Sequence, residues 1–93
     1  MNRLVLQAQL VERGALRYTP AGIPAFDMNL RHESQVTQEG QLRTISVEIR
    51  ARALGEITRR LAQVELGSLH GFAGFLGSHR NGRGVVFHVT ELD

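Results

Sequence analysis

Residues 54–79, LGEITRRLAQVELGSLHGFAGFLGSH, contain the change of pattern that decides the fold of this chain. In the first part, within residues 54–67, Ile57, Leu61 and Val64 lie at helical spacing and predict a one-sided helix of about ten residues. The second part, residues 68–79, predicts a strand that is unusually rich in glycine. Glycine weakens a flat strand but suits a strongly coiled strand or a bulge.

Period-2 alternation of apolar residues predicts three strands before this helix and one more strand at the end of the chain. The expected strands are residues 3–12, 25–34, 42–53 and 85–92. In the second of them, Phe26, Met28 and Leu30 point inward and polar or charged residues alternate outward. The segments between the strands are a proline-containing loop, 13–24, and a polar connection around Gly40, 35–41. The pair Asn81-Gly82 is a strong hairpin signal between the last two strands.

This order of three strands, one short helix and a glycine-rich hairpin predicts an all-β protein. It is the order of the five-stranded Greek-key barrel of the oligonucleotide/oligosaccharide-binding (OB) fold, with its helix between strands three and four. The 93 residues contain no internal repeat or linker, so we expect a single domain over residues 1–93. A core of this size leaves little room for a deep cavity, and a surface groove is the expected working site.

The sequence also indicates where the protein acts. It has no cysteine, which agrees with a reducing compartment. Gln7 and Gln9 interrupt the apolar run at the N-terminus, so this segment does not resemble a secretory signal. No apolar stretch approaches the ~20 residues that cross a membrane. We therefore expect a soluble cytoplasmic protein with no membrane partner.

Enzymatic functions find little support in the residue types. The absence of lysine excludes a Walker phosphate loop and a Schiff base, and the serines lack an elbow motif. The spacing of His70, His79 and His88 by nine residues could bring them together across a hairpin. No acidic ligand pattern accompanies them, so strand-face histidines are the expected interpretation and a metal site the minor alternative. We expect no catalysis and no cofactor.

The charge pattern favours a binding function. The formal net charge is only +2, but all 11 cations are arginine, whose planar group pairs with phosphate and stacks on bases. A GC-rich genome explains the same bias, and a charge of +2 cannot attract polyanions over the whole surface. A nucleic-acid site therefore needs local clustering of cations.

In the OB fold, such a site lies across strands two and three, between the loops after strands one and four. The candidates for contacts with nucleic acid are Arg17 and Tyr18 in the first loop, Arg31, Arg43, Arg50 and Arg52 on the strands, and Arg80 and Arg83 on the hairpin tip. The alternative is that polar turns simply carry charges. On the strands, Asp27, Glu33 and Glu48 could pair with the arginines and make them purely structural.

Several segments resemble the bacterial primosomal replication protein N, a relative of the single-stranded-DNA-binding proteins. They are residues 2–6 (NRLVL), 20–24 (PAGIP), 30–34 (LRHES), Gly74-Phe75 and His79-Arg80. The resemblance runs over nearly the whole chain. It implies a homodimer of such barrels that binds single-stranded DNA and assists a primosomal helicase, with other primosome proteins, in restarting stalled replication forks.

The chain also departs from that family. Better-known members carry lysines in the loop between strands four and five and aromatic side chains on strand three. Here Gln41 and Ser46 stand where the stacking aromatics are expected, and Ser46 is kept as a candidate contact. Tyr18 is the remaining exposed aromatic candidate, because Phe26, Phe72, Phe75 and Phe87 are expected in the core.

Two other functions remain open at this point: a protein-interaction adaptor that docks on a helicase and binds DNA weakly, and an RNA-binding barrel.

The first strand has apolar residues on part of both faces, including Val5 and Val11. Pairing between two copies would cover this strand, so we expect an isologous dimer built from strand one and a neighbouring hairpin.

Overall fold

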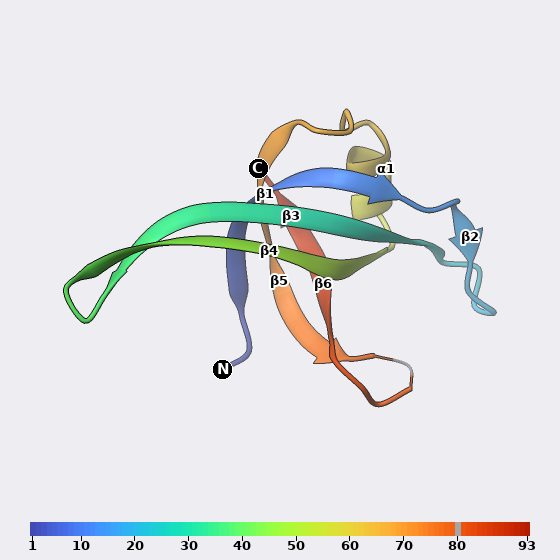
Figure 1. The fold of residues 1–93 in the computed structure, drawn as a ribbon. Helices are drawn as coiled ribbons and strands as arrows, with labels where there is room; N and C mark the ends of the chain where they lie inside the picture. Colours follow the sequence, from blue (N-terminus) through green and yellow to red (C-terminus); the bar gives the residue numbers. More distant parts are fainter. Residues whose placement is uncertain (80) are drawn as a thin grey trace.

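The computed structural model describes residues 1–79 and 81–93 and contains the predicted elements in the predicted order. They are β1 (Leu4–Arg13), β2 (Arg17–Tyr18), β3 (Pro24–Gln38), β4 (Gln41–Leu54), α1 (Ile57–Ala62), β5 (Leu69–Ser78) and β6 (Val85–Leu92) (Figure 1). The short strand β2, within the segment predicted as a loop, is the one addition. It pairs with the start of β3.

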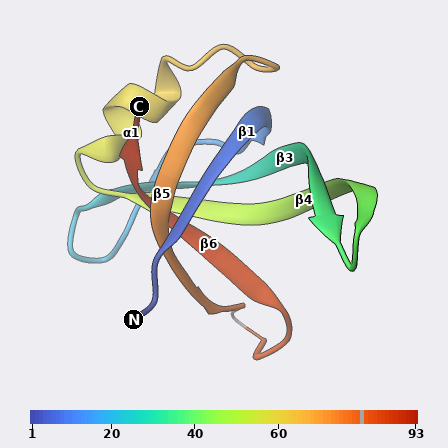
Figure 2. The same cartoon turned by 90° about the vertical axis from the view of Figure 1, so that its left-hand side faces the viewer.

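Strand β1 closes the barrel because it has two partners. Its first half pairs antiparallel with β5 and its second half with β3, and Gln9 belongs to both ladders. A parallel pairing of β4 with β6, through Ala51 with Phe87 and Arg52 with His88, completes the circuit β1–β5–β6–β4–β3. Figure 2 shows β3 and β4 running across β1, β5 and β6. The prediction of an all-β, five-stranded OB barrel with one helix after its third strand is confirmed.

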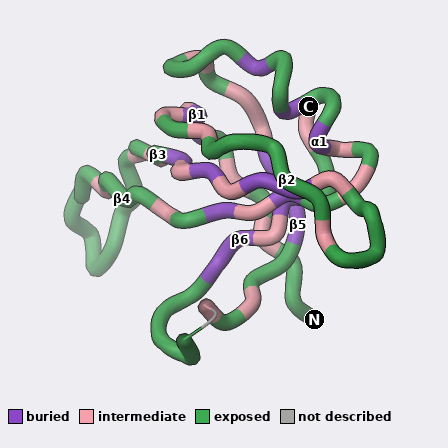
Figure 3. Tube along the Cα trace, turned by 90° about the vertical axis from the view of Figure 1, so that its right-hand side faces the viewer, coloured by how far each residue is buried: buried purple, intermediate pink, exposed green. Residues whose placement is uncertain are grey.

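The core lies where the strands cross, and Figure 3 shows the buried residues gathered there. Alternate side chains of each strand point inward, so Leu10 of β1, Leu30 of β3 and Phe87 of β6 are fully buried. The rest of the cluster of buried residues consists of Ala8, Phe26, Met28, Ala51, Ala53, Leu61, Val64, Phe72 and Val89. The inward positions predicted for Phe26, Met28 and Leu30 are confirmed.

The hairpin of β3 and β4 is longer than predicted and extends beyond the barrel (Figure 1). Residues 35–41 were expected as a polar connection, but strand pairing continues to Gln38 and Gln41, and this prediction was wrong. The turn consists of Glu39 and Gly40 alone, both with positive φ (52° and 73°), as in a type I′ turn. Outside the barrel both faces of the hairpin meet water, so its strands need no apolar alternation.

The helix is shorter than predicted, with six residues in place of about ten. At its C-terminal end, the guanidinium of Arg13 donates hydrogen bonds to the carbonyls of Leu61 (3.1 Å) and Val64 (2.8 Å). Val64 lies beyond α1 but remains buried, as the helical spacing required. The helix contacts β3, β4 and β6.

The glycine-rich strand β5 has the predicted irregularity. Its register with β6 shifts between Ala73 and Gly74, where the partner residues change from Glu91 to Val89. A Cβ atom on Gly74 would lie 1.8 Å from the carbonyl oxygen of His88, so only glycine fits there. The connection to β6 is a hairpin, as expected, and it spans residues 79–84 in place of the expected 80–84.

Candidate nucleic-acid interface

The outer face of β3 and β4 is polar and points away from the core. Residues opposite each other in an antiparallel pair share a face, so Asp27 with Arg52 and Arg31 with Glu48 point outward together. The next outward pair, Asn29 and Arg50, lies between them. This face is the one on which we expected a groove.

Two adjoining hollows form a continuous groove on this face. The smaller one, about 250 Å³, starts at Glu12 and Gly14 of the β1 end and crosses β3 and β4. The larger one, about 430 Å³, reaches the β5–β6 connection at Arg83 and Gly84. The hollows share three lining residues: Asn29 of β3, Arg50 of β4 and His79 of the β5–β6 connection. The groove thus runs between the loops that flank the predicted binding face.

Asp27 holds two arginines at one side of the groove. Arg52 donates from Nε to Asp27 Oδ1 at 2.8 Å, and Arg17 lies 3.4 Å from Oδ2. Partial burial raises the pKa of Asp27, but the hydrogen bond and charge of Arg52 and the charge of Arg17 outweigh it. The net pKa is lowered, so the carboxylate is ionised at neutral pH and fixes both guanidinium groups in place.

Arg50 and Arg83 line the middle and the far part of the groove. Within residues 1–79 and 81–93, neither has a carboxylate at ion-pair distance. Arg50 contacts the His79 ring, and the Arg83 backbone N–H donates to the Asn81 side chain at 2.9 Å. These two cations therefore keep their charge available to a ligand. Arg31, by contrast, lies 3.9 Å from Glu48.

The structure separates the other predicted contacts. Arg43 lies on the opposite face of the β3–β4 hairpin, where Nη1 donates to Gln38 at 3.0 Å. Ser46 is exposed on the outer face, opposite Glu33, but does not line the groove. Gln41 pairs with Gln38 beside the turn. Arg80 lies outside the described residues.

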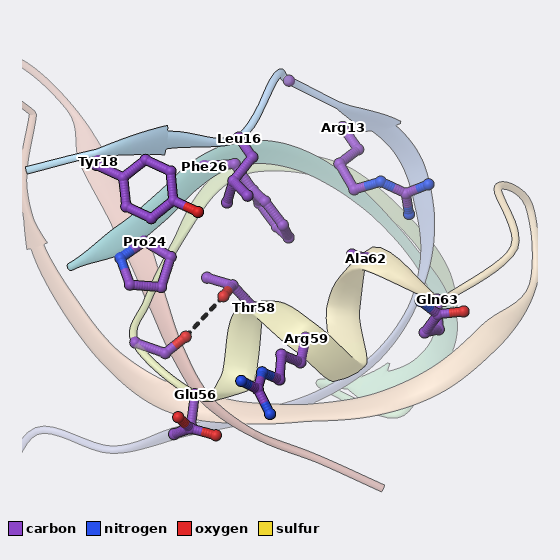
Figure 4. Close-up of a pocket in the computed structure, with 12 residues that line it drawn as sticks. Arg13, Leu16, Tyr18, Pro24, Phe26, Glu56, Thr58, Arg59, Ala62 and Gln63 are labelled. Atoms are coloured by element: carbon purple, nitrogen blue, oxygen red, sulfur yellow. Dashed lines mark hydrogen bonds between the residues drawn. The ribbon is translucent and has the colours of Figure 1, made fainter. Parts of the chain in front are cut away.

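Tyr18 also lies apart from the groove, although Arg17 beside it reaches the groove face. Adjacent residues of a strand point to opposite faces, and Tyr18 lines a different pocket of about 780 Å³ (Figure 4). This pocket lies between β2 and α1, and its lining includes Leu16, Pro24 and Arg59. The predicted pair of contacts in the first loop is therefore split between two surfaces.

One exposed aromatic side chain was missed. Phe75, expected in the core, is 43% exposed and stacks on His88 on the outer face of β5 and β6. The expectation failed because apolar residues flank Phe75 on both sides, which hides the alternation. The usable signal was its odd spacing from the buried Phe72, which places the two rings on opposite faces of one strand.

The three histidines at nine-residue spacing do not meet. His70 bonds to Ser68 Oγ at 3.0 Å, His79 contacts Arg50, and His88 stacks on Phe75. Over the described part of the chain, no group of three histidine, aspartate or glutamate side chains could hold a metal ion. No helix in that part is long and apolar enough to cross a membrane.

Comparisons with known proteins show the family of this chain. A family model described as "Another single-strand binding protein family" matches residues 2–91. The replication restart protein PriB of Bordetella pertussis is 44% identical over 80 residues, which cover 86% of this chain and 75% of that protein. The corresponding protein of Neisseria meningitidis serogroup B is 49% identical over 55 residues, which cover 58% of this chain and 55% of that protein.

Solved structures show the same likeness. The structure of PriB from Ralstonia solanacearum has a TM-score of 0.90 and 34% identity, and the match covers 100% of this chain and 96% of that chain. The single-stranded DNA-binding protein of Thermus aquaticus has a TM-score of 0.77 and 29% identity, with 100% of this chain and 49% of that chain covered. By sequence over nearly its whole length and by fold, this chain belongs to the PriB family of single-strand binding proteins.

Proposed function

We propose that this chain binds single-stranded DNA in the groove across β3 and β4 and acts as an accessory protein of the primosome. The observation that carries the proposal is the pair of arginines, Arg50 and Arg83, which line a groove between two loops without a carboxylate partner among the described residues. Its relatives bear the name replication restart protein. In this role the protein assists helicase loading and the restart of stalled forks, in the cytoplasm where the bacterial chromosome lies.

The groove holds a strand mainly through phosphate. Asp27 keeps the guanidinium groups of Arg17 and Arg52 in fixed positions, so less side-chain entropy is lost when a phosphate binds. Arg50 and Arg83 add charge further along the groove. The acidic residues Glu12 and Glu48 also line it, which limits the total attraction. We expect binding that is weak at physiological salt, nearly independent of base sequence, and better for single strands than for duplex.

The proposal includes a homodimer. The first half of β1, Leu4–Gln9, pairs with β5 along one edge, and Val5 is 66% exposed on its outer face. Pairing of β1 with a second copy would cover the open edge and this apolar side chain together. Sedimentation at micromolar concentration should give the mass of two chains. A single species with the mass of one chain would contradict the dimer.

An adaptor role has one observation in its favour. The pocket between β2 and α1 exposes Leu16 and Tyr18, which are 52% and 66% exposed, beside the cation Arg59 (Figure 4). Such a surface suits a segment of a primosomal helicase better than it suits a nucleic-acid backbone. In this second candidate function, docking on the helicase dominates and DNA contacts are secondary.

One experiment separates these functions. Labelled single-stranded DNA, single-stranded RNA and duplex DNA are titrated with the protein at several salt concentrations. A steep salt dependence with preference for single-stranded DNA supports the proposal. Equal binding of RNA favours the RNA-binding alternative, and undetectable binding of all three favours the adaptor. We also propose that the protein has no catalytic turnover, so ATP and DNA added in the same titrations should remain intact.

A further inference from the structure

The outer face of β5 and β6 carries a flat apolar surface next to the groove. The rings of Phe75 and His88 are stacked, with centroids 4.8 Å apart and planes within 7° of parallel. Phe75 is 43% exposed, which is unusual for a phenylalanine with a close-packed partner. The pairing of Arg52 with His88 joins this surface to the arginines held by Asp27.

Two local irregularities build this surface. On β6 the pairing skips Thr90, because Ala73 opposes Glu91 and Gly74 opposes Val89. The extra residue reverses the alternation of β6, so that Phe87 and Val89 point into the core and His88 points outward beside Phe75.

Gly77 makes room for the stacked imidazole. A Cβ atom on this residue would lie 2.9 Å from His88 Nε2, closer than unbonded atoms approach. With the imidazole in this position, a larger residue at position 77 would push the ring away from Phe75. Partial burial, and secondly the charge of Arg52, lower the pKa of His88, so the ring is neutral at pH 7. A neutral imidazole can pack face to face against the Phe75 ring without a charge that must stay hydrated.

Arginine residues lie on both sides of the stacked rings of Phe75 and His88. On one side, Arg52 is the β4 neighbour of His88. On the other side, Arg3 precedes Leu4, whose partner in β5 is Gly74, the residue before Phe75. The guanidinium of Arg3 is held by Glu91 at 2.9 Å and its side chain remains 51% exposed. A flat ring between two fixed guanidinium groups matches the alternation of base and phosphate along a single strand.

We propose that Phe75, supported from behind by His88, is a stacking site for a nucleobase of the bound strand, with the adjoining phosphates near Arg52 and Arg3. This inference rests on the proposed binding of single-stranded DNA. It adds a salt-insensitive contact to a groove that is otherwise electrostatic. Because every base has a flat face, the site takes any base and does not select a sequence.

The natural chain has no tryptophan, which allows a direct test. Phe75→Trp places a single fluorophore at the site, and Leu66→Trp places one on an exposed residue of the α1–β5 connection as the control. A labelled oligothymidylate is added, and its binding is followed by anisotropy while tryptophan emission is recorded. Stacking should quench Phe75→Trp in parallel with the anisotropy change and leave Leu66→Trp unchanged.

Phe75→Leu gives the energetic test, because it keeps an apolar side chain without the flat ring. We expect its affinity to fall by about 5- to 150-fold with the salt slope unchanged, the range for loss of one stacked base. If Phe75→Leu binds like the natural protein and Phe75→Trp emission is constant while the oligonucleotide is bound, the stacking site is wrong although DNA binding stands. If the natural protein itself does not bind the oligonucleotide, both proposals fail.

Discussion

Replacing Arg50 by glutamine should flatten the salt dependence of DNA binding, and the same change at Arg43 should not. Both residues are exposed arginines of β4, but Arg50 lines the groove and Arg43 lies on the opposite face of the hairpin. Each phosphate contact on a single strand contributes about −0.7 to the slope of log affinity against log salt concentration. The comparison therefore tests which face of the sheet the strand crosses.

The magnitude follows from the number of cations on the groove face. If Arg17, Arg50, Arg52 and Arg83 each contact one phosphate, the slope is about −2.8, and affinity falls about 50-fold between 50 and 200 mM salt. With three contacts the fall is about 18-fold. Anisotropy of a labelled oligothymidylate at four salt concentrations resolves this difference. An unchanged slope for Arg50→Gln together with a flatter slope for Arg43→Gln would refute the assignment of the groove.

Three further outcomes follow from the site. Arg83→Ala should lower affinity for single-stranded DNA and flatten the slope by about 0.7; wild-type binding would remove the hairpin tip from the interface. Tyr18→Ala should leave DNA affinity within about twofold, because Tyr18 lines the other pocket, and a clear loss would return it to the DNA site. Asp27→Asn should destabilise the protein in urea unfolding more at pH 7 than at pH 3. The lowered pKa of Asp27 means that the ionised carboxylate stabilises the fold above its unfolded pKa and stops doing so as pH falls through the folded value; equal losses at both pH values would contradict this linkage.

The barrel was predictable because its strands are half buried and therefore alternate in polarity. Phe26, Met28 and Leu30 show that alternation, and the period of Ile57, Leu61 and Val64 shows the helix. The continuation of β3 to Gln38 was missed because residues 35–38 are exposed and mostly polar, so they show no clear alternation. The contact of Arg13 with the end of the helix could not be predicted, because Arg13 is 48 residues from Leu61 in the sequence.

The candidate site was predictable in its location but only partly in its residues. The position of the groove follows from the fold, and Arg83 follows from its place in the hairpin loop. The separation of Tyr18 from Arg17 depended on a two-residue strand too short to show periodicity. The outward position of His88 depended on the extra residue Thr90 in β6, which no composition signal marks. The direction of a side chain near such a bulge can be predicted only from the register of the two paired strands, and that register is known only from the structure.

The two partners of β1 also set the order in which the protein matures on the ribosome. β1 leaves the exit tunnel before its partner β5, which follows 60 to 70 residues later, since Leu4 pairs with Gly74 and Gln9 with Leu69. The long β3–β4 hairpin and its pairing with the second half of β1 can form early. The first half of β1 must wait as an unpaired, partly apolar edge. Barrel closure is therefore a late event with a loop-closure cost, and the nascent chain is exposed to wrong pairings until β5 and β6 are made.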